Sequence, residues 1–451
     1  MTARESRTGE TQRKVLVVGL GRTGLSVARF LAARGHQVAV TDTRPEPPGL
    51  DEIRRSLPDV ALFLGGYDAD AFASAEQIVV SPGVPLGHPL IAEARCRGVE
   101  VIGDVELFAR VAQGPVIAVT GSNGKSTVTR WVADMARRAG REVRAGANLG
   151  TPALDLLQGG EPDLYALELS SFQLEAIESL RPVAAVVLNV SPDHLDRYRG
   201  LPEYAAAKAR IYRHAAMQIV NRDDPLAAGL ADPARPCVGF TLGVPAGKDF
   251  GIRQREGEDW LVRGEDWLLP ASAIRLAGRH NRANALAALA LAQAAGLPMP
   301  ACLDSLREFP GLPHRTQWVG RRAGADWYND SKATNVGATL AALEGFDRPL
   351  VLIAGGQGKG QDFSPLREPV CSRVRTLILM GQDADALAAA IGDCVPVARA
   401  GDMTAAVRAA AECARPGDAV LLSPACASQD MFRDFEQRGE QFARAVEALP
   451  S

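Results

Sequence analysis

Residues 115–140 read PVIAVTGSNGKSTVTRWVADMARRAG, and the order of patterns in this stretch decides which fold we expect. The apolar run at 116–119 is typical of a buried parallel strand, a glycine loop follows it, and an amphipathic helix pattern follows the loop. Backbone N–H groups of such a loop, at the N-terminus of a helix, can surround phosphate oxygens. We therefore expect a phosphate-binding loop made of Gly121, Ser122, Asn123, Gly124, Lys125, Ser126 and Thr127.

Each part of this loop has a predicted role. Lys125 would reach the β- and γ-phosphates of ATP, and the hydroxyl of Ser126 or Thr127 would bind a magnesium ion. Val119 stands where the general pattern has a glycine, so the chain departs from the common consensus at that position. The alternative interpretation is an ordinary glycine turn before a helix.

The same succession of strand, glycine loop and helix pattern begins twice more, at 14–35 (KVLVVGLGRTGLSVARFLAARG) and at 349–360 (PLVLIAGGQGKG). Three such starts predict three α/β domains with mainly parallel sheets, the outer two Rossmann-like and the central one a P-loop-type ATPase. Glycine and proline at 114–115 and 310–313 punctuate the chain, and the predicted domains are 1–112, 113–315 and 316–451. We also expect an antiparallel hairpin at 249–270 and an alanine-rich helix at 279–296.

Bulk properties narrow the classes of function. A formal net charge of -3 supplies no broad cationic face, so we expect no nucleic-acid partner. Seven scattered cysteines without a CxxC pair argue for a reducing compartment, and against a disulfide framework or structural zinc site. No segment has the length and hydropathy of a secretory signal or a membrane span. We expect a cytoplasmic, soluble, multidomain protein, folded from about residue 13 onward.

The first glycine loop, GLGRTG at 19–24, matches GxGxxG, and Asp42 follows at the end of the next predicted strand. Alone, this pattern fits a nicotinamide dinucleotide, with the acidic residue on a ribose diol. It equally fits another nucleotide or diphosphate. Lys359 in the third glycine loop is, on its own, as compatible with a solvated loop lysine as with a binding residue.

Three further side chains follow the phosphate loop. Glu168 lies in the apolar run of 164–175 (LYALELSSFQLE), where a carboxylate needs a partner such as magnesium, unless it faces solvent on an edge strand. His194, in SPDHLDRY at 191–198, follows a predicted parallel strand, where α/β sheets place ligands, and it fits a helix cap equally well. Lys208 lies among alanines and, taken alone, fits a surface lysine better than a functional one.

Together these segments resemble the Mur ligases, ATP-dependent enzymes that extend the peptidoglycan stem peptide. The central motifs are TGSNGKST at 120–127, LELSSFQLE at 167–175, NVSPDHLDRY at 189–198 and GRHNRANALAALALA at 278–292. NDSKATN at 329–335 and LSPACASQDMFRDFEQRG at 422–439 are similar to the member that adds D-glutamate to UDP-N-acetylmuramoyl-L-alanine. The resemblance implies activation of the alanyl carboxylate as an acyl phosphate, with ADP and phosphate as products.

The resemblance also assigns roles to single residues. The UDP-linked substrate would contact Thr23, Asp42, Thr43, Arg44, Gly83 and Asn148. Besides the phosphate loop, ATP would contact Asn281, Asn284, Arg315 and Asp330. Two magnesium ions would bind Thr127, Glu168, His194 and Lys208, with Lys208 carbamylated by carbon dioxide so that it carries negative charge. Lys125, Glu168, His194 and Lys208 would be catalytic. The glutamate pocket would comprise Lys332, Thr334, Lys359, Ser428, Gln429 and Phe435.

Two positions differ from the family pattern: Gln357 replaces an acidic residue, and Gln429 replaces a leucine. Competing interpretations are a ligase that adds L-glutamate, a folylpolyglutamate-type ligase, an NAD-dependent dehydrogenase and a P-loop binding module without chemistry. The dehydrogenase leaves the TGSNGKST loop and the last third of the chain unexplained, and the folate enzyme would lack a UDP-type first domain. We expect a monomer.

Overall fold

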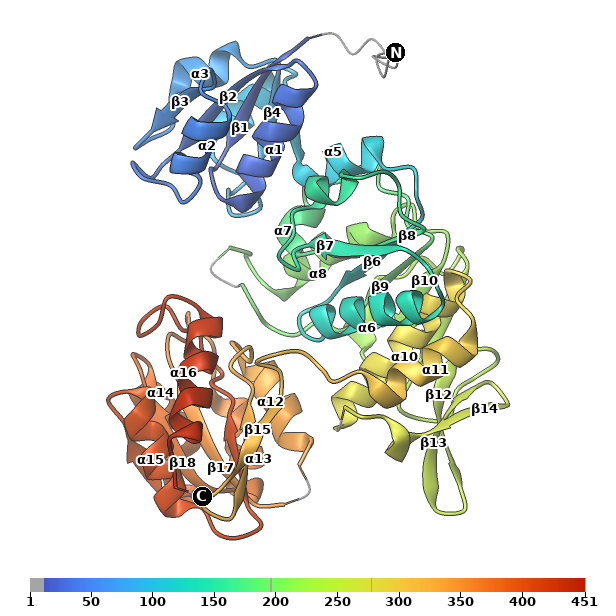
Figure 1. Ribbon diagram of the computed structural model, residues 1–451, viewed down its shortest axis with the longest axis vertical. Coiled ribbons are helices and arrows are strands. Elements are labelled where there is room, and N and C mark those ends of the chain that lie inside the picture. Colours follow the sequence, from blue (N-terminus) through green and yellow to red (C-terminus); the bar gives the residue numbers. More distant parts are fainter. Residues whose placement is uncertain (1–11, 195–196, 277, 347, 451) are drawn as a thin grey trace. The chain divides into compact units, whose positions relative to one another are not determined.

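The structure is a computed structural model that describes residues 12–194, 197–276, 278–346 and 348–450 (Figure 1). The chain divides into two units, one formed by residues 1–120, 140–185 and 207–217 and the other by 121–139, 186–206 and 218–451. We expect the fold to begin at about residue 13. Residues 1–11, to which this expectation applies, lie outside the described part of the chain. Within the described residues, no helix is both long and apolar enough to span a membrane.

The first unit begins with a five-stranded parallel sheet in the order β3-β2-β1-β4-β5. The strands are continuous apolar runs, and Leu16, Ile78 and Val80 pack with Phe72 and Ile91 of the helices in one core. The elements are β1 (Lys14–Val18), α1 (Arg22–Ala33), β2 (Gln37–Asp42), α2 (Leu50–Ser56), β3 (Ala61–Leu64), α3 (Ala69–Ser74), β4 (Gln77–Val80), α4 (Pro89–Cys96), β5 (Glu100–Gly103) and α5 (Asp104–Val111).

A nine-stranded sheet follows, in the order β14-β13-β12-β11-β10-β9-β6-β8-β7. Its elements in the first unit are β6 (Val116–Thr120), β7 (Val143–Ala147), η1 (Ala153–Leu157), β8 (Leu164–Glu168), α7 (Ser171–Leu174) and η2 (Arg210–Tyr212). Two elements cross the division between the units, β9 (Ala184–Val187) and α8 (Leu201–Ala209). Strand β8 has neighbours on both sides and Glu168 is buried, so the alternative of a solvent-facing Glu168 on an edge strand is wrong.

The second unit supplies the rest of this sheet. Residues 249–270 form an antiparallel meander of three strands, which confirms the predicted hairpin and extends it by one strand. The predicted alanine-rich helix is α10. The elements are α6 (Lys125–Arg138), β10 (Gln218–Asn221), α9 (Pro225–Ala228), β11 (Cys237–Phe240), β12 (Phe250–Arg255), β13 (Glu258–Arg263), β14 (Asp266–Pro270), η3 (Ala271–Ala273), α10 (Arg279–Ala294) and α11 (Met299–Glu308).

The last sheet has the order β15-β16-β20-β17-β18-β19 and is parallel except for the β15–β16 pair. The apolar strand β17 alternates: Leu350, Leu352 and Ala354 face one core, while Val351 and Ile353 face the other. Helices therefore cover both faces, as the continuous apolar run predicts. The elements are β15 (Gln317–Arg322), β16 (Ala325–Asn329), α12 (Val336–Glu344), β17 (Leu350–Gly355), η4 (Ser364–Leu366), α13 (Arg367–Arg373), β18 (Val374–Met380), α14 (Ala384–Ile391), η5 (Gly392–Cys394), β19 (Val397–Arg399), α15 (Met403–Cys413), β20 (Ala419–Leu422) and α16 (Phe435–Glu447).

The cysteines depart from expectation at one point. Cys371 and Cys394 form a disulfide between α13 and η5, with their Cα atoms 5.3 Å apart. The spacing of the two residues, 23 positions, has no motif that signals a pair, and β18 and α14 separate them in the chain. The argument from scattered cysteines therefore missed a local crosslink.

Candidate functional site

The phosphate loop has the geometry that its sequence predicts. Strand β6 runs into the loop, and Gly124 adopts a φ of 83° as the residue that precedes α6. Lys125 Nζ donates to the carbonyls of Gly121 at 2.8 Å and Ser122 at 2.9 Å, so the ammonium folds over the loop. The side chain of Asn189 accepts from the N–H of Asn123 at 2.8 Å and fixes the far side of the loop.

A cavity of about 1040 Å³ opens beside this loop in the second unit. It brings together Thr127 of the loop, the α10 residue Asn281, and Asp330 and Lys332 after β16. Predicted ATP and glutamate residues that line it are Asn123, Gly124, Thr127, Asn281, Asn284, Arg315, Asp330 and Lys332. Segments more than 200 positions apart in the sequence thus share one cavity, as a site for two substrates requires.

Contacts across this cavity hold the loop close to its neighbours. A Cβ added to Gly124 would lie 2.5 Å from Oδ1 of Asn284, so only glycine allows this approach. Arg315 donates to the hydroxyl of Ser126 at 2.7 Å. A guanidinium beside the phosphate loop adds positive charge where a triphosphate would lie.

Asp330 is a buried carboxyl in the wall of the cavity. Burial raises its pKa to about 7, even though the N–H of Thr316, the hydroxyl of Ser423 and the charge of Arg315 lower it. The N–H of Thr316 and the Ser423 hydroxyl each donate to the carboxyl at 3.0 Å. This group therefore changes charge near neutral pH.

Glu168 has the features of a cation ligand. The side chain is 3% exposed at the end of β8, and Asn148 Nδ2 donates to its Oε1 at 2.6 Å. Its Oε2 is buried and has no hydrogen-bond partner among the described residues. A buried carboxylate oxygen without a donor is costly, and a divalent cation would supply the missing partner. The structure thus brings Asn148 and Glu168 together and leaves Oε2 of Glu168 available to a cation.

Lys208 is 1% exposed, so the interpretation of it as a surface lysine is wrong. It lies in the last turn of α8. His194 has a φ of 54°, and its Nε2 lies 3.8 Å from Oδ2 of Asp193. No cluster of three or more His, Cys, Asp or Glu side chains suited to a metal ion occurs among the described residues, so magnesium would also need the hydroxyl, carbamate and phosphate oxygens.

In the first unit, Asp42 organises the GLGRTG loop. Its carboxylate accepts from the N–H of Leu20 at 2.7 Å and from the guanidinium of Arg44 at 2.9 and 2.7 Å. Burial raises the pKa of Asp42, but the Arg44 and Leu20 hydrogen bonds outweigh it and lower the pKa to about 2. The carboxylate thus ties the end of β2 to the glycine loop. Thr43, Arg44 and Gly83 are exposed around it, and Thr23 is half-buried.

The predicted glutamate residues gather around the ends of β17, β20 and α16. Nζ of Lys332 lies 3.7 Å from the ring centroid of Phe435, and Ser428 is buried. Gln357 and Ala427 exchange backbone hydrogen bonds of 2.9 Å, which ties the loop that carries Lys359 to the segment that carries Ser428 and Gln429. Because Gln357 acts here through its backbone, the loss of the family's acidic side chain leaves this bridge unaffected.

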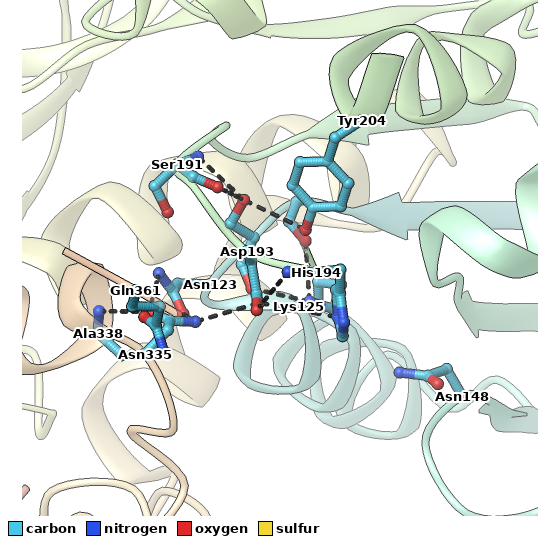
Figure 2. A network of polar contacts seen from close by, with 12 residues as sticks. Asn123, Lys125, Asn148, Ser191, Asp193, His194, Tyr204, Asn335, Ala338 and Gln361 are labelled. Carbon is cyan, nitrogen blue, oxygen red and sulfur yellow. Dashed lines mark hydrogen bonds and ion pairs between the residues drawn. The ribbon is translucent and has the colours of Figure 1, made fainter. Parts of the chain in front are cut away.

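Sequence reasoning missed two residues of the site. Arg438 on α16 is fully buried and donates to Ser331 O at 2.7 Å and to Cys426 O at 3.1 Å. Asn335 precedes α12, and Figure 2 shows its side chain pointing toward Asn123 and Asp193. An asparagine directly before a helical pattern is a recognisable N-cap signal, and this signal could have identified Asn335. No local pattern signals Arg438, because its partners come from distant segments.

Family models match the chain in three consecutive segments. Residues 13–103 match "Mur ligase MurD-like, N-terminal domain", 119–292 match "Mur ligase middle domain", and 314–426 match "Mur ligase, glutamate ligase domain". A protein from Nitrosococcus oceani named UDP-N-acetylmuramoylalanine--D-glutamate ligase is 57% identical over 438 residues, covering 97% of each chain.

The chain belongs to the Mur ligase family.

Other relatives of this Mur ligase agree. A Pseudomonas putida protein of the same name is 53% identical over 96% of this chain and 97% of its own. A solved pseudomurein peptide ligase type C from Methanothermus fervidus shares the fold, with a TM-score of 0.62 and 19% identity over 97% of this chain and 99% of that one. The predicted α/β fold class is confirmed, and as a Mur ligase the chain is an ATP-dependent enzyme.

Proposed function

We propose that this Mur ligase joins D-glutamate to UDP-N-acetylmuramoyl-L-alanine and converts ATP to ADP and phosphate. The observation that carries the proposal is the single cavity lined by the phosphate loop and by Lys332 of the NDSKATN segment. Such a cavity holds a triphosphate and an anionic amino acid close together. The name of the relatives that are 57% and 53% identical supports the choice of substrates.

The carboxylate of the alanyl group is a poor electrophile, so the first step activates it. A carboxylate oxygen attacks the γ-phosphorus of ATP, the bond to the bridging oxygen breaks, and an acyl phosphate and ADP form. Lys125 and the loop amides stabilise the charge on the transferring phosphoryl group. Asn281, Asn284, Arg315 and Asp330 hold the nucleotide from the other walls of the cavity.

Magnesium fits the residues that the family pattern assigns to it. Bound magnesium would offset the negative charge that gathers around the phosphates. Thr127 and Glu168 would hold one ion, and the unpartnered Oε2 of Glu168 supports that assignment. His194 and Lys208 would serve the second ion, Lys208 as a carbamate: its neutral amine adds to carbon dioxide, forms an N–C bond and loses one proton. A carbamate is anionic, so it would attract the ion that an ammonium repels.

The amine of glutamate attacks the acyl carbon in the second step, and phosphate leaves from the tetrahedral intermediate. The positive charges of Lys332 and Lys359 suit the two negatively charged carboxylates of the amino acid. Thr334, Ser428, Gln429 and Phe435 complete the proposed pocket. Water competes for an acyl phosphate, so these residues must also exclude it from the acyl carbon.

The UDP-linked substrate occupies the first glycine loop in this proposal. Thr23 and the loop amides take the diphosphate, Asp42, Thr43 and Arg44 take the uridine, and Gly83 lies beside it. Asn148 contacts substrate from the central segment while it orients Glu168. We propose domain boundaries at 112/113 and 315/316, and a monomer that acts in the cytoplasm on these small molecules.

The direct test of the mechanism uses UDP-N-acetylmuramoyl-L-alanine with ¹⁸O in both alanyl carboxylate oxygens. With ATP, magnesium and D-glutamate, we expect one ¹⁸O in each released phosphate and a product heavier by the glutamyl residue. Phosphate without ¹⁸O would exclude the acyl phosphate. Product with L-glutamate alone would move the chain to the related L-glutamate ligases, and activity on a folate alone would replace the UDP assignment.

A further inference from the structure

The N-terminus of α12 lies against the phosphate loop, and one asparagine makes the polar part of that contact (Figure 2). Asn335 is 3% exposed. Its Oδ1 accepts from the N–H of Ala338 at 2.8 Å and so caps the helix. Its Nδ2 donates to Oδ2 of Asp193 at 3.2 Å and to Oδ1 of Asn123 at 3.4 Å. We call the contacts with Asp193 and Asn123 the Asn335 bridge.

The first turn of α12 packs closely against the loop. A Cβ added to Gly337 would lie 3.0 Å from Oγ of Ser191, which is tighter than ordinary van der Waals contact, and 3.4 Å from Nδ2 of Asn123. Close packing of the first turn of α12 against two loops of the central sheet is therefore a feature of this sequence.

The same first turn is bound on its other side to the lysine loop, residues 356–361. Gln361 Oε1 accepts from the N–H of Val336 at 3.0 Å, and its Nε2 donates to the carbonyl of Gly358 at 3.0 Å. Gly358 immediately precedes Lys359, a proposed glutamate contact. A displacement of the α12 N-terminus would therefore move the backbone next to Lys359.

The choice of residue at 335 points to more than a helix cap. Serine, aspartate and asparagine cap helices about equally well, because each offers an acceptor oxygen. Among them only asparagine also supplies N–H donors, and Asn335 uses these for a carboxylate and an amide from the central segment. The donor function has no role in capping α12.

We propose that Asn335 is a positioning residue that couples the phosphate loop to the lysine loop. Through the Asn335 bridge it fixes the α12 N-terminus on Asn123 and Asp193, and through Gln361 the same turn holds the backbone beside Lys359. The position of the lysine loop, and with it the site for the amino acid, therefore depends on the position of the phosphate loop. This inference rests on the proposed function in taking Lys359 as a contact of the amino acid and in identifying that amino acid as glutamate.

The kinetic test compares Asn335→Ser and Asn335→Asp, which keep the cap, with wild type. Asn335→Ser removes both hydrogen bonds of the Asn335 bridge, which are long at 3.2 and 3.4 Å. Loss of one well-formed buried hydrogen bond changes an equilibrium by about tenfold, so we expect the KM for D-glutamate to rise by at least about tenfold in Asn335→Ser. Asn335→Asp should raise it further, because a second carboxylate would face Asp193. Asp402→Ser is the matched control: Asp402 caps α15 through Ala405, and the variant should keep the wild-type KM. An unchanged KM in both Asn335 variants would overturn the proposal.

A second measurement needs no turnover. Hydrogen exchange of the full chain, followed by mass spectrometry, should show faster exchange at 336–339 and at 356–361 in Asn335→Ser, with β17 and α15 unchanged. Gln361→Ala removes the acceptor of the Val336 N–H, so it should speed exchange at Val336 and at 356–361 and leave 337–339 unchanged. Wild-type exchange in both segments of Asn335→Ser would overturn the coupling. If wild type shows no glutamate-dependent turnover, the proposed function fails, while the exchange result still decides the coupling.

Discussion

Lys208 is the residue whose interpretation depends most on the fold. Its sequence context of alanines is typical of a surface helix, yet the side chain is 1% exposed. Burial of an ammonium is expensive, so a buried lysine needs either a compensating environment or a chemical change that suits its surroundings. Carbamylation is such a change, and it makes the residue a candidate metal ligand.

Replacement of Lys208 therefore tests the two-ion arrangement. We expect Lys208→Ala to lower turnover by at least about 100-fold, the scale of losing a group that stabilises charge in the transition state. Added bicarbonate should not restore it, because no amine remains to be carbamylated. Lys248→Ala, at an exposed lysine, is the control and should keep wild-type turnover. Turnover close to wild type in Lys208→Ala would contradict the assignment.

Asp330 predicts a pH dependence of stability. Its pKa is raised from 3.8 to about 7 by burial, so the folded protein retains a proton that the unfolded chain releases. The contribution of this group to the free energy of unfolding thus falls as pH rises from about 4 to about 7, by up to about 1 kcal/mol per pH unit, and is level above that range.

The measurement compares melting temperatures of wild type and Asp330→Asn at pH 5, 6, 7 and 8. Asparagine has the same shape and no charge, so wild type should lose stability relative to the variant between pH 5 and 7. A difference that stays constant from pH 5 to 8 would contradict the raised pKa.

At the scale of elements, α16 and the loops it supports depend on Arg438. The guanidinium is fully buried among carbonyls of Ser331, Cys426 and Ala427, and burial lowers its pKa to about 10, so it remains charged at neutral pH. Ser331 precedes Lys332, and Ala427 precedes Ser428. One side chain thus holds two segments of the proposed glutamate pocket.

We expect Arg438→Met to destabilise the protein by about 3 kcal/mol, because it leaves buried carbonyls without donors. It should also raise the KM for glutamate. Arg433→Met, at an exposed arginine only five positions away, should change neither quantity. Thermal denaturation and initial rates measure both effects, and a wild-type melting temperature for Arg438→Met would contradict this account.

The disulfide between α13 and η5 is a second element-scale feature. It closes a segment with a separation of 23 positions, and chain entropy assigns such a crosslink about 3 kcal/mol. The denatured, unreduced protein should titrate five thiols, and the reduced protein seven. Reductant should lower the melting temperature of wild type and leave that of Cys371→Ser unchanged. Seven thiols without reductant would show that the bond does not form in solution.

Local sequence patterns predict most helices and strands of this fold but few of the contacts between distant segments. The strand, loop and helix at 115–140 follow from an apolar run, two glycines and an amphipathic pattern, all of which act locally. Burial of Lys208, the hydrogen bond from the N–H of Leu20 to Asp42 and the disulfide depend on segments that meet only in the folded chain. Asn335 lies between these cases, because its cap is local while its bridge to Asp193 spans 142 positions.

At the scale of the whole molecule, the described residues form three sheets, and a cavity among them joins distant segments. The cavity receives the phosphate loop from the central sheet and Lys332 from the last one. In our proposal, the phosphate loop activates the acid and the segment that carries Lys332 presents the amine. The family and its ATP dependence are established for this chain, and the identity of the two substrates is the central claim that remains to be measured.

The most direct test is phosphate release with ATP, magnesium and UDP-N-acetylmuramoyl-L-alanine, with D-glutamate, L-glutamate or no amino acid in parallel reactions. Our account predicts release that depends on D-glutamate and on the UDP-linked acid, with a background level in the other two reactions. Release with L-glutamate alone, or none with either enantiomer, would contradict it.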